Sequence, residues 1–118
     1  IIGRKGEIKQ LVNPDRFVAY HAGKSAYFSP IERKWVKGCN DICLGIELIG
    51  DGNMMAYEPE QYQSLARLCA YLYKRYKTID PRFITGHENV SPGRKNDPGK
   101  KFDCAGFSVA FMLRLGEL

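Results

Sequence analysis

Residues 43–77 read CLGIELIGDGNMMAYEPEQYQSLARLCAYLYKRYK, and this stretch decides the fold class. Its first part, Cys43 to Ile49, is a nearly continuous apolar run broken only by Gly45 and Glu47. A short apolar run bounded by turn residues is typical of a buried central strand. Its second part, Glu58 to Lys77, repeats apolar residues at intervals of three and four, which predicts an amphipathic helix. A strand followed by a helix that can pack on it indicates an α/β domain.

The segments on either side extend the same plan. Ile1-Ile2 and Glu7 to Val12 flank a turn with two glycines, which predicts a β-hairpin. Phe83 to Thr85 is expected to form another short strand, Glu88 to Lys101 a loop with two prolines, and Asp103 the cap of a last helix. We therefore predict one α/β domain over residues 1–118, with a single central mixed β-sheet flanked by helices.

The segment from Lys24 to Asp41 is polar, basic and aromatic without periodicity, which predicts a long surface loop. Loops of this length are usually functional or disordered. Tyr27 and Trp35 argue against disorder, because large aromatic side chains there would either pack or bind something.

Length and composition narrow the classes of function. A chain of 118 residues with 44% hydrophobic residues fits one compact domain. The net charge of +5 indicates an anionic partner or a solvated basic surface. The basic residues are scattered, with a small group at Arg33, Lys34 and Lys37, and lack the interleaved aromatic pattern of RNA-binding sheets. We therefore expect no nucleic-acid partner, and a basic nucleic-acid-binding domain stays a weaker alternative. No apolar run is long enough to span a bilayer, so we expect no membrane partner.

The four cysteines are Cys39, Cys43, Cys69 and Cys104, and no two of them form a CxxC pair. A zinc ribbon or a thioredoxin-like site is therefore not expected. Cys69 lies among the apolar residues of the predicted helix and is expected to be a small core residue. We predict that the four thiols are free.

The residues that suggest chemistry lie near the second histidine. His87 follows a predicted strand, and Asp97 comes ten residues later across a loop rich in Pro and Gly. A histidine nitrogen and an aspartate oxygen are both normal zinc ligands, so the pair suits one metal ion. Lys95 would point to the same side of an extended loop as Asp97, where its ammonium group could stabilise an oxyanion. A loop pair without metal is the simpler interpretation of these residues taken alone.

Two further residues are ambiguous when only their neighbours are considered. Glu47 interrupts an apolar strand, so it either pairs with a nearby cation or acts as a general base. His21 follows a short apolar stretch and could be a loop histidine, a metal ligand or a substrate contact.

Five ordered blocks resemble the N-acetylmuramoyl-L-alanine amidases, in the AmpD-type branch of the family that includes the peptidoglycan recognition proteins. Together they cover nearly the whole chain, which makes the resemblance far more specific than any single block. The blocks are Arg4-Lys5-Gly6-Glu7-Ile8, Tyr20-His21-Ala22-Gly23, Cys39-Asn40-Asp41 with Leu44-Gly45-Ile46-Glu47-Leu48, Thr85-Gly86-His87, and Ser91-Pro92-Gly93-Arg94-Lys95-Asn96-Asp97-Pro98-Gly99 with Phe102-Asp103.

The resemblance implies an enzyme that hydrolyses the amide bond between N-acetylmuramic acid, or its 1,6-anhydro form, and L-alanine. It implies Zn²⁺ held by His87 and Asp97, with Glu47 as general base and Lys95 as the oxyanion stabiliser. His21, Arg94 and Asn40 would contact the substrate, a muropeptide or peptidoglycan fragment. The AmpD-type pattern also implies a cytoplasmic location. It gives no oligomeric state.

The resemblance also implies a third zinc ligand, a histidine on a strand upstream of the first hairpin. This chain holds two histidines, His21 and His87. We therefore expect a domain that lacks its N-terminal strand and helix, with an incomplete zinc site. Two alternatives remain: His21 supplies the third ligand, or the chain is a non-catalytic module that binds muropeptides.

Overall fold

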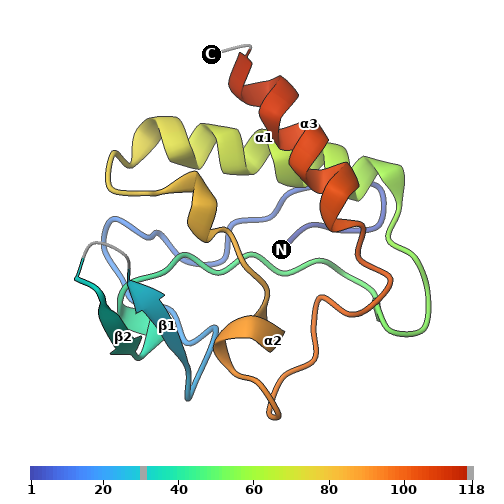
Figure 1. Ribbon diagram of the computed structural model, residues 1–118. Coiled ribbons are helices and arrows are strands. Elements are labelled where there is room, and N and C mark those ends of the chain that lie inside the picture. Colours follow the sequence, from blue (N-terminus) through green and yellow to red (C-terminus); the bar gives the residue numbers. More distant parts are fainter. Residues whose placement is uncertain (30–31, 117–118) are drawn as a thin grey trace.

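The computed structural model describes residues 1–29 and 32–116 (Figure 1). The principal helices are α1 (Pro59–Arg75) and α3 (Cys104–Gly116). The smaller elements are β1 (Ala26–Ser29), β2 (Lys34–Lys37), η1 (Cys39–Asp41), η2 (Pro81–Phe83) and α2 (His87–Val90). No helix among the described residues is both long and apolar enough to cross a membrane.

The two long helices form one layer of the molecule. Figure 1 shows α3 crossing α1, with the extended N-terminal segments and the β1–β2 hairpin below them. The core between these layers consists of buried apolar side chains. They are Ile2, Leu65, Ala66, Cys69, Ala70, Phe107 and Phe111. Because Phe107 and Phe111 lie one turn apart, they are on the same face of α3, and this face packs in the core with Leu65 and Cys69 of α1.

Both long helices begin with the caps that their sequences predict. Glu58 and Gln61 form a capping box at the start of α1, with Pro59 in its first turn. The Asp103 carboxylate accepts a hydrogen bond from Gly106 N at 2.8 Å, which confirms the predicted cap of the last helix. All four cysteines are free thiols, and Cys69 is buried in the core, as predicted.

The predicted N-terminal hairpin is present over its first residues. Ile2 pairs with Ile8 in an antiparallel bridge, and Lys9 N donates to Ile1 O at 2.9 Å. The pairing ends there, and Leu11 and Val12 continue as irregular chain.

The expected central strand from Cys43 to Ile49 is wrong as a continuous ladder. The segment forms a single parallel bridge between Leu48 and Ile2, and Ile2 N donates to Glu47 O at 2.7 Å. Leu44 and Ile49 are 40% and 42% exposed. A ladder needs a partner strand whose residues pair successively along the run, and among the described residues Ile2 alone forms a β-bridge with this segment.

The expected loop from Lys24 to Asp41 is also wrong, because most of it forms an antiparallel hairpin. β1 pairs with β2 in a register that places Tyr27 opposite Val36 and Phe28 opposite Trp35. Cross-strand pairs of aromatic and β-branched residues stabilise such a hairpin. Four residues per strand are too few for the alternation to stand out in the sequence.

The remaining differences lie around the second histidine. Pro81–Phe83 is a 3-10 turn capped by Asp80, whose side chain accepts from Arg82 N at 2.9 Å, so the strand predicted from Phe83 is absent. The loop predicted from Glu88 begins with the short helix α2. Both corrections place His87 at the start of a helix and not at the end of a strand.

Candidate functional site

His87 and Asp97 converge, as their spacing predicted. His87 Nδ1 lies 2.6 Å from Asp97 Oδ2, and Glu88 N donates to Asp97 O at 3.0 Å. The two side chains are 28% and 54% exposed, so the pair lies at the surface and is open to a ligand. The ten-residue loop between them is thus closed by contacts at both its side chains and its backbone.

The loop that carries Asp97 is held by a turn that the sequence reading did not single out. Tyr57 OH donates to Pro98 O at 2.7 Å, and Asn53 Oδ1 accepts from Lys100 N at 3.2 Å. Burial is the main cause that raises the pKa of Tyr57, which keeps the phenol protonated as a donor. The turn cluster at residues 50–53 marks the position of Asn53 in the sequence, whereas nothing local marks Tyr57.

The donor types at His87 and Asp97 fit zinc, which is bound by imidazole nitrogen and carboxylate oxygen. Within residues 1–29 and 32–116, no third His, Cys, Asp or Glu joins them to make a group of three. His21 does not complete the site, because its Nε2 lies 2.9 Å from the carbonyl oxygen of Cys43. The described residues therefore present two candidate ligands at this point, His87 and Asp97.

His21 and Asn40 are joined by a side-chain clamp. Asn40 Oδ1 accepts from the backbone N–H groups of His21, Ala22 and Gly23, at 2.9, 2.7 and 3.3 Å. The ring of His21 packs on Gly45, where an added Cβ would lie 2.5 Å from its Cγ. Asn40 thus fixes the backbone around His21, while its predicted contact with substrate stays a prediction.

Arg94 and Ser91 tie this segment to the segment that carries Asp97. The Arg94 guanidinium donates to Ala22 O and, at 3.3 Å, to Lys24 O. Ser91 Oγ donates to Lys24 O at 2.6 Å. Arg94 therefore holds two loops together, and a role in substrate binding stays a prediction for it as well.

Glu47 and Lys95 are both exposed. Within the described part of the chain, no hydrogen bond or ion pair joins either side chain to His87 or Asp97. Gly45, two residues before Glu47, touches His21, and Lys95 follows Arg94, which binds the backbone next to His21. The segments of all the candidate residues are thus linked through the His21 loop.

Two of the cysteines, Cys43 close to His21 and Cys69 in the core, are poor nucleophiles. Burial, and then the neighbouring Cys39, raises the pKa of the Cys43 thiol to about 11. Burial raises the pKa of Cys69 to about 12. Because the thiolate is the reactive form, both thiols stay protonated and unreactive near neutral pH.

We expect Asn40→Ala to destabilise the fold by about 2–3 kcal/mol, because three backbone donors lose one shared acceptor. Ala22 is 2% exposed, so water cannot easily replace the lost oxygen at its N–H. The urea midpoint of unfolding measures this loss. Asn40→Asp keeps the acceptor oxygen and is the matched control. Equal midpoints for Asn40→Ala and the unsubstituted chain would contradict the clamp.

The chain was compared with known families and proteins. Residues 1–100 match the family Amidase_2, described as N-acetylmuramoyl-L-alanine amidase. The 1,6-anhydro-N-acetylmuramyl-L-alanine amidase AmpD of Citrobacter freundii is 44% identical over 107 residues, which cover 91% of this chain and 52% of that protein. AmiD of Escherichia coli K12, an N-acetylmuramoyl-L-alanine amidase, is 35% identical and matches over 83% of this chain and 36% of its own.

Solved structures agree with these similarities. A crystal structure of a selenomethionine derivative of AmpD matches with a TM-score of 0.78 and 43% identity, over 91% of this chain and 55% of that one. AmpDh3 of Pseudomonas aeruginosa, solved in complex with anhydromuramic pentapeptide, matches with a TM-score of 0.71 and 28% identity, over 86% of this chain and 40% of that one. These matches confirm the mixed α/β fold class. The chain spans about half the length of the AmpD proteins that it matches. With 100 of its 118 residues matched, the chain belongs to the N-acetylmuramoyl-L-alanine amidase family Amidase_2.

Proposed function

We propose that the protein containing this chain hydrolyses the amide bond between N-acetylmuramic acid, or its 1,6-anhydro form, and L-alanine. The observation that carries the proposal is the 2.6 Å approach of His87 Nδ1 to Asp97 Oδ2 in a chain of this amidase family. The relatives named for the anhydro substrate support the anhydro form as the first one to test. A cytoplasmic location stays a prediction.

Zinc is the metal we propose for His87 and Asp97, because the two donor types match its preferences. When bound, zinc polarises a carbonyl oxygen and lowers the pKa of water. Glu47 is proposed as the general base, which takes a proton from the attacking water and returns it to the departing amine. Lys95 is proposed to stabilise the negative charge that develops on the carbonyl oxygen, since it is exposed and lies two residues before Asp97.

A second candidate function is a non-catalytic module that binds muropeptides. It is favoured by one observation, the presence of two and not three candidate metal ligands within the described residues. The retention of Glu47, Lys95 and Asp97 argues for the enzyme, because a module that only binds has no chemical use for all three.

The test is an assay of the purified protein with an anhydro-muropeptide. We expect release of a peptide that begins with L-alanine, identified by its mass, together with about one zinc per protein. Chelation should abolish release and added Zn²⁺ should restore it, because a zinc site depends on its metal. Muropeptide binding without zinc and without release would support the non-catalytic module.

A further inference from the structure

The outer face of the β1–β2 hairpin carries an exposed aromatic pair. Phe28 and Trp35 face each other across the two strands, with ring centroids 5.9 Å apart and planes at 71°. Their exposed fractions are 47% and 67%. We refer to these two rings as the aromatic platform. Aromatic side chains dominate the energetics of many interfaces, so an exposed pair in mutual contact is a candidate contact surface for a partner.

The hairpin turns this pair outward because its other face is anchored. Successive side chains of a strand point to opposite faces. Tyr27, next to Phe28, packs against the buried cluster of Ala22, Cys39 and Val90. Phe28 and Trp35 therefore point away from the protein.

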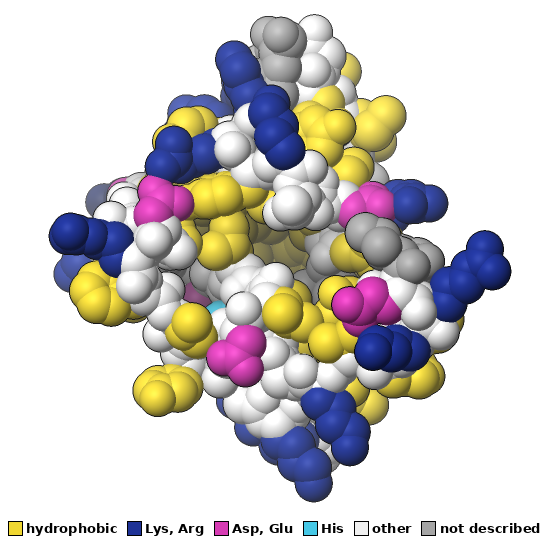
Figure 2. Space-filling view, turned by 90° about the vertical axis from the view of Figure 1, so that its left-hand side faces the viewer, with side chains coloured by type: hydrophobic (Ala, Val, Ile, Leu, Met, Phe, Trp, Pro, Cys, Tyr) yellow, Lys and Arg dark blue, Asp and Glu magenta, His cyan; other side chains and the backbone are white. Residues whose placement is uncertain are grey.

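Basic residues surround the platform. The register pairs Lys37 with Ala26 and so places it on the same face as Trp35, two residues along the strand. Arg33, in the turn before β2, is exposed, with Glu32 as the acidic residue next to it. Lys34 is also exposed, but the alternation of the strand places it on the opposite face from Trp35. Figure 2 looks onto the side of the molecule that carries the hairpin, and hydrophobic side chains lie next to Lys and Arg side chains on its right. The surface thus joins an apolar ring face to positive charge.

The hairpin is also tied to the candidate site. Ser91 Oγ and the Arg94 guanidinium both donate to Lys24 O, two residues before β1. Val90, the last residue of α2, lies in the cluster on which Tyr27 packs. One short helix therefore begins with His87 and ends against the hairpin.

We propose that the aromatic platform binds a pyranose ring of the glycan attached to the muropeptide, while Arg33 and Lys37 attract the carboxylates of its peptide. This inference rests on the proposed function, because the substrate it extends is a muropeptide. A pyranose has an apolar C–H face of about the width of one aromatic ring. A single aromatic pair therefore suits one sugar ring better than it suits a polymer with many stacking groups. The basic side chains complement the anionic peptide and not the neutral sugar.

Other occupants of such a surface leave different signatures. A single-stranded nucleic acid stacks on rows of aromatic rings and follows a basic groove, with steep salt dependence. The hairpin offers one aromatic pair with two nearby cationic residues, Arg33 and Lys37, and one acidic residue, Glu32. The observations therefore favour the sugar.

The experiment follows the fluorescence of Trp35 in the purified protein. The emission that disappears in Trp35→Phe reports on residue 35 alone. A disaccharide–tetrapeptide muropeptide and an N-acetylglucosamine tetramer are titrated separately. We expect both to change this emission, with tighter binding of the muropeptide. Phe28→Ala should weaken both by about tenfold, a typical loss for an aromatic contact residue. Lys37→Gln should weaken the muropeptide more than the neutral tetramer.

The matched control is Tyr71→Ala, because Tyr71 is an aromatic residue on α1 with an exposed fraction of 57%. This variant should bind both ligands as the unsubstituted protein does. An unchanged Trp35 emission with both ligands, in a protein that still cleaves muropeptide, would overturn the platform and leave the proposed function intact. Ligand binding at Trp35 in a protein that does not cleave muropeptide would support the platform and count against the proposed function. A response only to single-stranded DNA or to anionic lipid vesicles would also overturn it.

Discussion

Asp97→Ala is expected to lower kcat/KM for muropeptide hydrolysis by about a thousandfold or more. The substitution removes one of the two candidate ligands, Asp97 Oδ2, which lies 2.6 Å from His87 Nδ1. Metal stabilisation of a transition state contributes several kcal/mol, and about 1.4 kcal/mol corresponds to tenfold in rate. Zinc content measured after dialysis should fall in parallel with the rate.

The fold should survive this change, because the Asp97 side chain is 54% exposed and its removal leaves no cavity. Near-ultraviolet circular dichroism checks that the variant is folded. Glu88→Gln is the matched control, since Glu88 is an exposed carboxylate directly after His87. A folded Asp97→Ala protein with full activity would remove Asp97 from the site and count against the zinc proposal.

The helices could be predicted from the sequence because their signals are local. Leu65 and Cys69 repeat at helical spacing in α1, and Pro59 and Asp103 mark helix starts, so each boundary falls within a few residues of the prediction. A helix closes its own hydrogen bonds, so a short stretch of sequence holds most of the information about it.

The strands could not be predicted as well, because pairing depends on distant residues. The apolar run from Cys43 indicates that the segment tends to be buried, but it does not show whether other strands pair with it. The hairpin that carries Phe28 and Trp35 was missed for a different reason. Its strands do pair, but each is too short for the alternation of side chains to be visible in the sequence. Both cases concern partners, and a single segment does not encode its partner.

The candidate site divides in the same way. The spacing of His87 and Asp97 across a Pro- and Gly-rich loop suited two ligands of one metal, and the family resemblance made their meeting the prediction; the structure brings the two side chains together. The support from Tyr57, which lies 41 residues before the carbonyl that it binds, has no local signature. The dual use of Arg94 as a link between loops is also visible only once the chain is folded.

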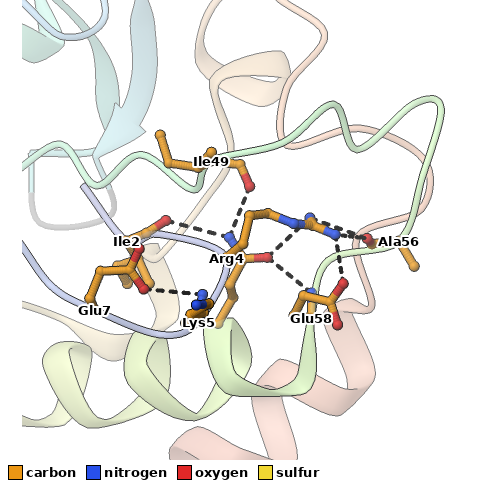
Figure 3. A network of polar contacts seen from close by, with 8 residues as sticks. Ile2, Arg4, Lys5, Glu7, Ile49, Ala56 and Glu58 are labelled. Atoms are coloured by element: carbon orange, nitrogen blue, oxygen red, sulfur yellow. Dashed lines mark hydrogen bonds and ion pairs between the residues drawn. The ribbon is translucent and has the colours of Figure 1, made fainter.

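Gln61 is the polar residue on which the packing of α1 depends most. Its side chain is fully buried, at 0% exposure. Its Oε1 accepts from Glu58 N at 2.9 Å and from the Arg4 guanidinium at 3.2 Å, and its Nε2 donates to Ile49 O at 2.9 Å. Figure 3 shows Arg4, Glu58 and Ile49 gathered around this point from three different segments. One amide therefore caps the helix and joins it to the bridge between Ile2 and Leu48.

Gln61→Leu should destabilise the fold by about 3–4 kcal/mol, the largest effect on stability that we predict. Leucine has a similar volume, so the loss comes from buried polar groups left without partners, at about 1–3 kcal/mol each. A typical domain is stable by about 5–15 kcal/mol, so the urea midpoint should fall markedly. Gln63→Leu, an exposed position on the same helix, should change it little. If the two variants unfold at the same urea concentration, the Gln61 amide does not hold α1 to the bridge, and apolar packing between α1 and α3 alone positions the helix.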